Sequence, residues 1–478
     1  MTRPVRPAPP HWTALVFQML PFADAASVDL PLGRLLRLAL FQVSVGMAMV
    51  LLNGTLNRVM VVELGTPTWL VALLIAVPLL VAPFRALIGH KSDTHRSVLG
   101  WRRVPYIWFG TLMQFGGLAI MPFALLLLGK PGAFNIGLFG ATAAFLLTGI
   151  GFHVTQTAGL ALATDLAPED KRPRAVALLY VMLLVGMMFA AFVIGGVLID
   201  YSATRLVQVI QGAAVLTIVL NVTALWKQEA RNPAVTAPDR ERPSFSVLWQ
   251  AFVRDGRNAR LLTAIGIGAA GFAMQDALLE PYGGEILGLS VGATTGLTGA
   301  WALGSLIGFM ISGRMLARGW DPLRLAGAGM VIGINAFLLV LFSGPFAAPL
   351  MLYAGALTIG LGLGLFSVGT LMEAMSLAKT ETAGLALGAW GAVQASCAGA
   401  GIALGGLLRD AIAALVGNGE AASIATRSAG YSTVYILEIT LLLIGLAAIG
   451  PLVGSRRRSP PDADDPLSQP FGLREFPT

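Results

Sequence analysis

The composition of this 478-residue chain excludes an ordinary soluble domain. Hydrophobic residues make up 56% of the sequence, charged residues only 12%, and the mean hydropathy is +0.75. Because soluble domains carry roughly 25% charged residues, we predict a polytopic membrane protein. The net charge of +7 comes from basic residues in short loops beside apolar runs, which is typical of membrane topology and argues against a nucleic-acid partner.

The sequence shows neither a reaction centre nor a cysteine framework. The one cysteine, Cys397, falls inside an apolar run, which excludes a disulfide and a thiolate metal cluster and favours a small core residue. No nucleophile, base and electrophile form a recognisable cluster, so we do not expect an enzyme. The N-terminal MTRPVRPAPPHW lacks a long apolar region and a small-residue cleavage site, so we expect no cleaved signal peptide.

Twelve apolar runs follow an N-terminal lead-in. Residues 1–33 are Pro-rich and contain Pro21 and Pro31, which predicts a cytoplasmic segment that lies on the membrane surface. Each later run is long enough to cross a bilayer as a helix. The predicted spans are 35–57, 66–88, 104–128, 135–163, 173–199, 204–226, 259–284, 292–316, 322–342, 347–378, 382–408 and 431–454.

A short basic loop follows the second predicted span. The stretch GHKSDTHRSVLGWRRVPY contains Gly89, Asp93, Gly100, Arg102 and Arg103. In this order they resemble the loop after the second helix of major facilitator superfamily transporters, although the segment between Asp93 and Gly100 is longer here. Glycine lets two helix ends approach, and an aspartate near a helix end can pair with arginines of the neighbouring turn. The alternative is an ordinary cytoplasmic loop whose charge reflects topology alone.

The charges of the loops predict the orientation of the chain. With these spans, 27 of the 32 Lys and Arg residues lie on the side of the N-terminus, so both termini should be cytoplasmic. The longest polar stretch, residues 227–258, divides the spans into two sets of six, 34–226 and 259–454. Residues 455–478 are predicted to form a disordered cytoplasmic tail.

The two halves carry similar sequences. ATDLA, after the fourth span, matches AMSLA, after the tenth, at an offset of 211 residues. Two six-helix units related by such a repeat are typical of facilitator-type transporters. We therefore predict an all-α membrane protein with twelve transmembrane helices in two six-helix halves, the major facilitator fold.

Span seven contains a dense group of polar residues. MQDALLEPYGG, residues 274–284, includes Gln275, Asp276, Glu280 and Tyr282, and its two carboxylates are four residues apart, on one helix face. Counting about 1.5 Å per residue places both near the far headgroups. The proline and glycines after Glu280 predict a broken, re-entrant helix end. The alternative is a capped helix end with solvated carboxylates.

Span four offers a second polar group. GFHVTQTAGL places His153 and Gln156 inside an apolar run, where an ionisable residue indicates function. A neutral imidazole can ligate a metal, including the magnesium of a chlorin, or can hydrogen-bond a neighbouring helix. Glu373 and Glu438, in spans ten and twelve, are interpreted as paired structural charges.

The spans lack the central Asp, Glu and Arg set expected of a proton-coupled carrier for a polar substrate. A water-filled polar cavity is therefore not predicted. The spans are rich instead in Gly, Ala, Met and Phe, which ordinary helix packing explains. A flat apolar ligand that enters from the lipid would need the same kind of wall.

Four blocks of the chain together resemble one family. They are residues 21–65, the loop at 89–108, MQDALLEPYGGEILGL at 274–289 and AGLALGAWGAVQ at 383–394. Over about residues 21–455 the chain resembles the bacteriochlorophyll delivery (PucC/LhaA) family of the major facilitator superfamily. Within that family it is more similar to the LhaA group, which serves the core light-harvesting complex. The resemblance implies a multi-pass protein of the bacterial inner, intracytoplasmic photosynthetic membrane that binds bacteriochlorophyll, or a late chlorin precursor, and assists antenna assembly.

The resemblance also implies partners and, with the polar residues above, candidate pigment ligands. The expected partners are the antenna alpha and beta polypeptides, with the reaction centre, bacteriochlorophyll synthase, membrane lipid and a second copy of the chain as further candidates. The candidate ligands are His153, Gln156, Gln275, Asp276, Glu280 and Tyr282, with His153 as a candidate axial ligand to the pigment magnesium. Two alternatives stay open: a secondary transporter of a small amphipathic solute, and a scaffold that binds antenna helices without pigment.

Overall fold

The regular elements of the computed structural model are helical throughout the residues that it describes. These residues are 25–27, 30–80, 84, 88, 92, 101–130, 132–168, 171–229, 254, 256–376, 383–416 and 424–453. The α-helices are α2 (Leu32–Leu38), α3 (Leu40–Met49), α4 (Leu56–Arg58), α5 (Thr68–Leu80), α7 (Val104–Leu128), α8 (Phe134–Leu166), α9 (Arg172–Val197), α10 (Ala203–Leu225), α12 (Gly256–Ala273), α13 (Leu279–Glu285), α14 (Val291–Ala317), α15 (Pro322–Ser343), α16 (Pro349–Ser376), α17 (Ala383–Val416) and α18 (Ile424–Ile449). Two π-helical segments, η2 (Val50–Thr55) and η3 (Val59–Glu63), and two 3-10 turns, η7 (Met274–Ala277) and η8 (Gly450–Leu452), complete the set.

The helices confirm eleven of the twelve predicted spans and part of the second one. Within the described residues, eleven helical segments are long and apolar enough to cross a membrane, and a shorter apolar helix lies at the second predicted span. Span one is longer than predicted, since it runs from Leu32 to Glu63 and takes in part of the expected lead-in. The helix of span eleven also continues beyond its predicted end, to Val416. Most of the predicted lead-in, residues 230–253 of the linker and residues 454–478 lie outside the described residues.

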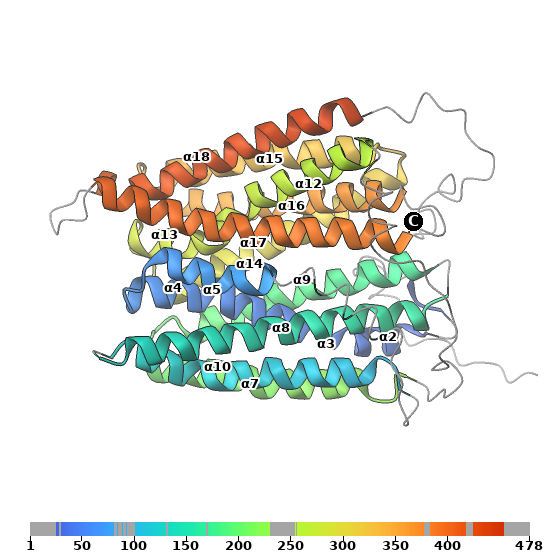
Figure 1. The fold of residues 1–478 in the computed structure, drawn as a ribbon, viewed down its shortest axis with the longest axis horizontal. Coiled ribbons are helices and arrows are strands. Elements are labelled where there is room, and N and C mark those ends of the chain that lie inside the picture. Colours follow the sequence, from blue (N-terminus) through green and yellow to red (C-terminus); the bar gives the residue numbers. More distant parts are fainter. Residues whose placement is uncertain are drawn as a thin grey trace, which may run out of the picture.

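The helices run side by side in two groups, one above the other in Figure 1. In the first half α7 packs against α8 and α10, and α3 packs against α9 and α10. In the second half α16 packs against α14 and α15, and α18 packs against α12 and α15. The start of α2 and the end of α18 lie at the same end of the bundle, which we call the terminal end; the opposite end is the distal end.

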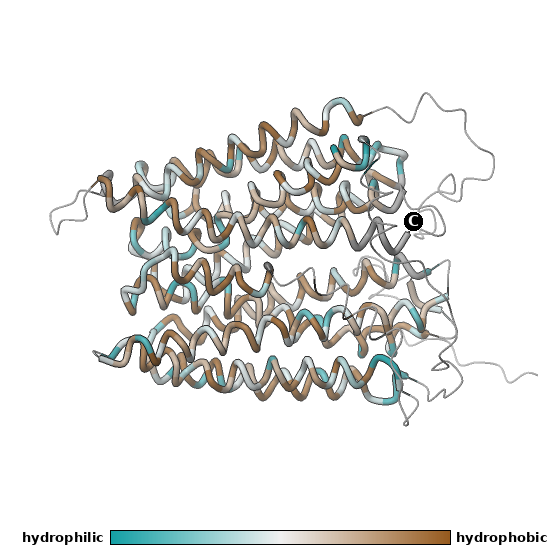
Figure 2. The backbone as a smooth tube through the Cα atoms, in the orientation of Figure 1, coloured by the Kyte–Doolittle hydropathy of each residue, from teal (hydrophilic) through white to brown (hydrophobic). Residues whose placement is uncertain are grey.

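The outer surface of the bundle is apolar. Figure 2 shows brown and white along the middle of the helices, with teal gathered toward their ends. Large apolar side chains point outward here, including Phe123, which is 65% exposed, and Phe139, which is 78% exposed. Water would oppose such exposure, whereas lipid chains favour it, so the surface supports a multi-pass membrane protein.

Part of the basic loop motif forms ion pairs at the terminal end. Arg102 and Arg103 both reach Asp165, near the end of α8, at N–O distances of 2.5 and 3.0 Å. The arginines of the motif therefore pair with the aspartate of ATDLA in this structure. Gly89, Asp93 and Gly100 lie outside the described residues.

The most extensive contacts between the halves are made by two helix pairs, α5 with α17 and α9 with α14. At the second of these joins, a side chain on Gly292 would place its Cβ 2.5 Å from the carbonyl oxygen of Gly195 and 3.0 Å from the backbone of Ile199. Backbone atoms cannot move aside as a flexible side chain can, so the close approach of α9 and α14 requires glycine at 292.

We expect Gly292→Val to loosen this join and to lower stability by about 1–3 kcal/mol, the usual cost of overpacking. Thermal unfolding of the purified protein in mild detergent measures the change. Gly196→Val is the matched control, because a Cβ there meets nothing within 4 Å. Equal midpoints for the two variants would show that the α9–α14 contact does not depend on glycine.

Candidate functional site

Span seven is broken near its distal end. α12 ends at Ala273, a 3-10 turn covers Met274–Ala277, and α13 begins at Leu279. The predicted break is thus present, but it precedes Pro281 instead of following it. Pro281 is the third residue of α13, where the backbone has no helical acceptor for an N–H, so proline is tolerated there.

Span one also departs from α-helical geometry near its distal end. Its residues from Val50 to Thr55 and from Val59 to Glu63 form wide π-type turns, which often occur at functional sites. This part of span one, including α4 between the two turns, meets spans seven and eight of the other half. The hydroxyls of Thr55 and Thr295 lie 3.1 Å apart, and the Asn57 amide donates to the carbonyl oxygen of Asp276 at 3.3 Å.

Three carboxyl groups lie around the break in span seven. Glu280 is only 3% exposed, and it accepts a hydrogen bond from the Thr298 hydroxyl. Glu438, fully buried on α18, accepts the backbone N–H of Gln275 at 2.6 Å. Asp276 is half-buried and accepts a hydrogen bond from the Gln275 side chain. The interpretation of Glu280 as a solvated carboxylate is therefore wrong.

Span one holds a buried arginine near its distal end that the sequence did not indicate. Arg58, 5% exposed, pairs with Glu63 and donates to the carbonyl oxygen of Leu289 at 3.2 Å. A carboxylate or guanidinium taken out of water costs several kcal/mol unless it is paired. The sequence hid this group because Arg58 and Glu63 appear to follow the first span, whereas the helix in fact continues through them.

A second charged cluster lies at the distal end, on α17. Arg409 pairs with Glu285 and with Asp410, and its guanidinium lies 4.7 Å from the centre of the Tyr431 ring. Asp410 also accepts the backbone N–H of Trp69 at 2.8 Å, at the start of α5. The cluster therefore links α13, α17 and α18 of one half to α5 of the other.

The other predicted site residues, His153, Gln156 and Tyr282, make their contacts away from the carboxyl groups at the break. Gln156 donates to the Gln42 side chain at 3.3 Å, and the His153 ring lies 4.5 Å from that of Phe152. Tyr282 lies edge-on to Tyr431 and Tyr435, at ring distances of 5.3 and 5.6 Å. Of the six candidate ligands, the structure thus brings Gln275 and Asp276 into direct contact and places Glu280 on the next helix.

The predicted pairing of Glu373 is confirmed. Its carboxylate lies 3.0 Å from the Arg257 guanidinium, near the terminal end of the second half. Glu438 is instead held by a backbone N–H, as described above. Both residues are almost fully buried, which explains why each has a hydrogen-bonding partner.

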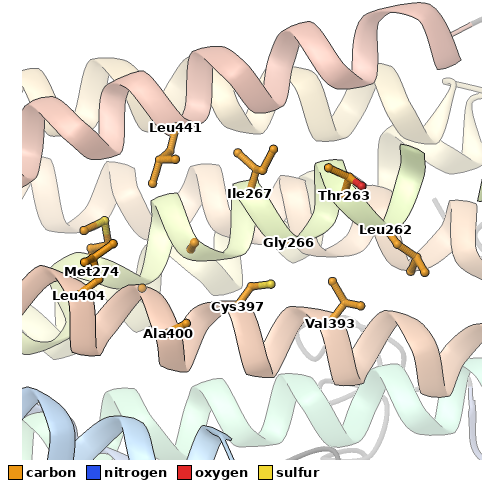
Figure 3. A pocket seen from close by; sticks show the side chains of 12 residues that line it. Leu262, Thr263, Gly266, Ile267, Met274, Val393, Cys397, Ala400, Leu404 and Leu441 are labelled. Atoms are coloured by element: carbon orange, nitrogen blue, oxygen red, sulfur yellow. The ribbon is translucent and has the colours of Figure 1, made fainter. Parts of the chain in front are cut away.

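An apolar groove lies between α12, α17 and α18. Its volume is about 530 Å³, and Figure 3 shows Met274 and Leu404 at one end and Leu262 and Thr263 at the other. Small residues on facing helices keep it open. The groove is lined by Leu262, Thr263, Gly266, Ile267, Ala270, Met274, Val393, Cys397, Ala400, Gly401, Leu404 and Leu441.

The groove opens on the outer surface of the second half. Leu404 is 51% exposed, and Ala400 beside it is also exposed. Cys397, expected to be a core residue, is half-buried and lines this groove. Sequence reasoning missed the groove, because a run of small and apolar residues predicts close helix contact and an open cleft equally well.

We expect Glu438→Ala to destabilise the protein by about 1–3 kcal/mol, because it leaves the buried N–H of Gln275 without its acceptor. Glu438→Gln keeps an amide oxygen at the same position and should unfold close to the wild-type temperature. Thermal unfolding in detergent compares the two variants. If both lose the same stability, the carboxylate does not act through this hydrogen bond.

Known proteins with similar sequences and structures now identify the family. The family described as PucC protein matches residues 55–457. A Rhodobacter capsulatus protein, described as an uncharacterized protein in the puhA-bchM intergenic region, is 51% identical over 472 residues, 97% of this chain and 98% of that protein. Protein PucC of Rhodovulum sulfidophilum is 56% identical over 404 residues, 83% of this chain and 89% of that protein.

Solved structures agree on the fold. A bacterial homolog to the human lysosomal transporter Spinster, in an inward-facing and unoccupied conformation, superposes with a TM-score of 0.64 at 15% identity, covering 87% of this chain and 95% of that one. At that identity the likeness concerns the fold alone. The chain therefore belongs to the PucC family, as a multi-pass membrane protein with the major facilitator fold, and its relatives from photosynthetic bacteria support a role in the assembly of photosynthetic complexes.

Proposed function

We propose that this protein binds bacteriochlorophyll, or a late chlorin precursor, inside the bilayer and delivers it to the antenna polypeptides of the core light-harvesting complex. The observation that carries the proposal is the apolar groove between α12, α17 and α18. The groove has a volume of about 530 Å³, within the roughly 300–1,000 Å³ typical of small-molecule sites.

The chemistry of the groove suits a flat, water-insoluble macrocycle. Its lining is aliphatic except for the hydroxyl of Thr263, the thiol of Cys397 and the thioether of Met274. A ligand that enters from the lipid would exchange one apolar environment for another, so delivery inside the membrane avoids exposing the pigment to water. The adaptable side chain of Met274 suits an irregular ligand surface.

The pigment also needs an oxygen or nitrogen ligand for its magnesium. Gln275 and Asp276 directly follow Met274 along the chain, so they are the predicted ligands closest in sequence to the groove lining. Gln156, by contrast, donates to Gln42 on α3, in the other half. We therefore favour Gln275 and Asp276 over the span-four pair His153 and Gln156 as the ligand-bearing groups.

We expect Ala400→Phe to fill the groove and to reduce the pigment that co-purifies with the protein at least severalfold. Ala400 is exposed, so the larger ring should leave the fold intact. The measurement is the pigment absorbance per protein after gentle solubilisation from the native photosynthetic membrane. Ala414→Phe is the matched control, since Ala414 is exposed on the same helix and does not line the groove.

Two results would contradict this proposal. Wild-type protein without pigment, but with antenna polypeptides attached, would favour the scaffold function. Undiminished pigment in Ala400→Phe would place the pigment elsewhere. In that case the variants His153→Ala and Gln156→Ala would show whether the pigment is held on span four.

A second candidate function is supported by the buried carboxyl groups. Glu280 lies between the halves. It packs against Gly54 of span one and accepts a hydrogen bond from the Thr298 hydroxyl of span eight. Buried carboxyl groups in membrane spans often carry protons in transporters. Uptake of an amphipathic solute into proteoliposomes, dependent on a proton gradient and lost in Glu280→Gln, would favour the transporter.

A further inference from the structure

A pocket of about 710 Å³ lies at the terminal end of the first half, away from the apolar groove. The ends of α2, α7 and α10 surround it. Three tryptophans contribute to its lining, and both aromatic and charged side chains face it. The lining residues are Arg34, Trp101, Val104, Trp108, Val222, Leu225, Trp226, Lys227, Gln228 and Glu229.

Hydrogen bonds hold the walls of this pocket in place. Gln228, fully buried, accepts two hydrogen bonds from the Arg34 guanidinium, at 3.1 Å on its side-chain oxygen and at 2.6 Å on its carbonyl oxygen. Its own amide donates back to the carbonyl oxygen of Arg34 at 3.1 Å. These contacts fix the turn after α10 against α2, so the cationic wall is preorganised.

The one acidic residue of the lining is engaged elsewhere. The Glu229 carboxylate accepts the backbone N–H groups of Arg102, Arg103 and Val104, at 2.7 to 3.1 Å. It thereby caps the N-terminus of α7, whose positive dipole end offsets its charge. The positive charges of Arg34 and Lys227 therefore dominate the pocket.

The backbone at Lys227 is strained. Its φ of 53° lies in the left-handed region, which is unfavourable for a residue with a side chain such as lysine. Glycine would adopt this conformation without strain. A glycine at position 227 would therefore keep this turn while removing the lysine charge.

We propose that this pocket binds the headgroup of an anionic phospholipid. A phosphate would lie against Arg34 and Lys227, and the acyl chains would run along Trp108, Val222 and Leu225. Tryptophan is favoured at the level of lipid headgroups, and Trp108 and Trp226 are 41% and 60% exposed. The apolar side chains of the lining favour a lipid over a free phosphate ion, because only a lipid has acyl chains that can pack against them.

The test uses the full-length protein in nanodiscs of phosphatidylcholine with increasing phosphatidylglycerol. We expect phosphatidylglycerol to raise the unfolding temperature of the wild type and to remain bound in native mass spectrometry. Lys227→Gly removes the charge and the backbone strain together. It should bind phosphatidylglycerol about fivefold more weakly, since one lysine near an anionic surface contributes about 1 kcal/mol.

The same variant separates binding from folding. In pure phosphatidylcholine, Lys227→Gly should unfold at the wild-type temperature or above, because glycine relieves the strain. Lys130→Gly is the control, since Lys130 is exposed at the distal end and does not line the pocket. Trp226→Leu should also weaken phosphatidylglycerol binding while keeping an apolar surface.

Three outcomes would overturn the proposal. The first is equal stability of the wild type in both lipids. The second is unchanged phosphatidylglycerol binding by Lys227→Gly. The third is displacement of the lipid by inorganic phosphate at matched ionic strength, which would assign the pocket to a soluble anion.

Discussion

The burial of ionisable groups within the spans is the constraint on which this structure depends. A carboxylate removed from water is costly, so Glu280 and Glu438 require hydrogen-bond donors inside the protein. The interruption of span seven supplies one of them, because the 3-10 turn leaves the N–H of Gln275 available to Glu438. The break in span seven and the buried acid on α18 are thus joined by this one hydrogen bond.

The same break lies where the apolar groove of the second half meets the polar residues of span seven. α12 faces the apolar groove along its length, and Met274, the first residue after it, lines the groove's end. The next residues, Gln275 and Asp276, carry the polar groups. A metal-bearing apolar ligand in this groove would therefore have carboxyl and amide groups near the Met274 end and only the Thr263 hydroxyl at the other (Figure 3), which would set its orientation.

The two halves meet through two kinds of contact. At the α9–α14 join, glycine allows the backbones to touch. At the distal end the contacts are polar, as between Thr55 and Thr295 and between Asp410 and the N–H of Trp69. Because polar contacts need defined directions, they fix the relative rotation of the spans more strictly than apolar packing does. At the terminal end of the first half, the hydrogen bonds between Gln228 and Arg34 join the turn after α10 to α2 in the same directional way.

The sequence by itself determined the class of protein and the number of spans, since apolar length and loop charge depend on residues near one another in the chain. The superfamily followed from the resemblance of its motifs to a known family. The sequence also located the polar group of span seven. Only the tertiary structure decided that Glu280 is buried, that Arg58 lies within a span and that Cys397 lines a groove. These features depend on the rotation and depth of each helix. When a span is apolar on nearly every face, the spacing of its apolar residues indicates neither the rotation nor the depth of the helix. Contacts such as Gln275 with Glu438, or Arg34 with Gln228, form only when distant helices pack, so the sequence did not predict them.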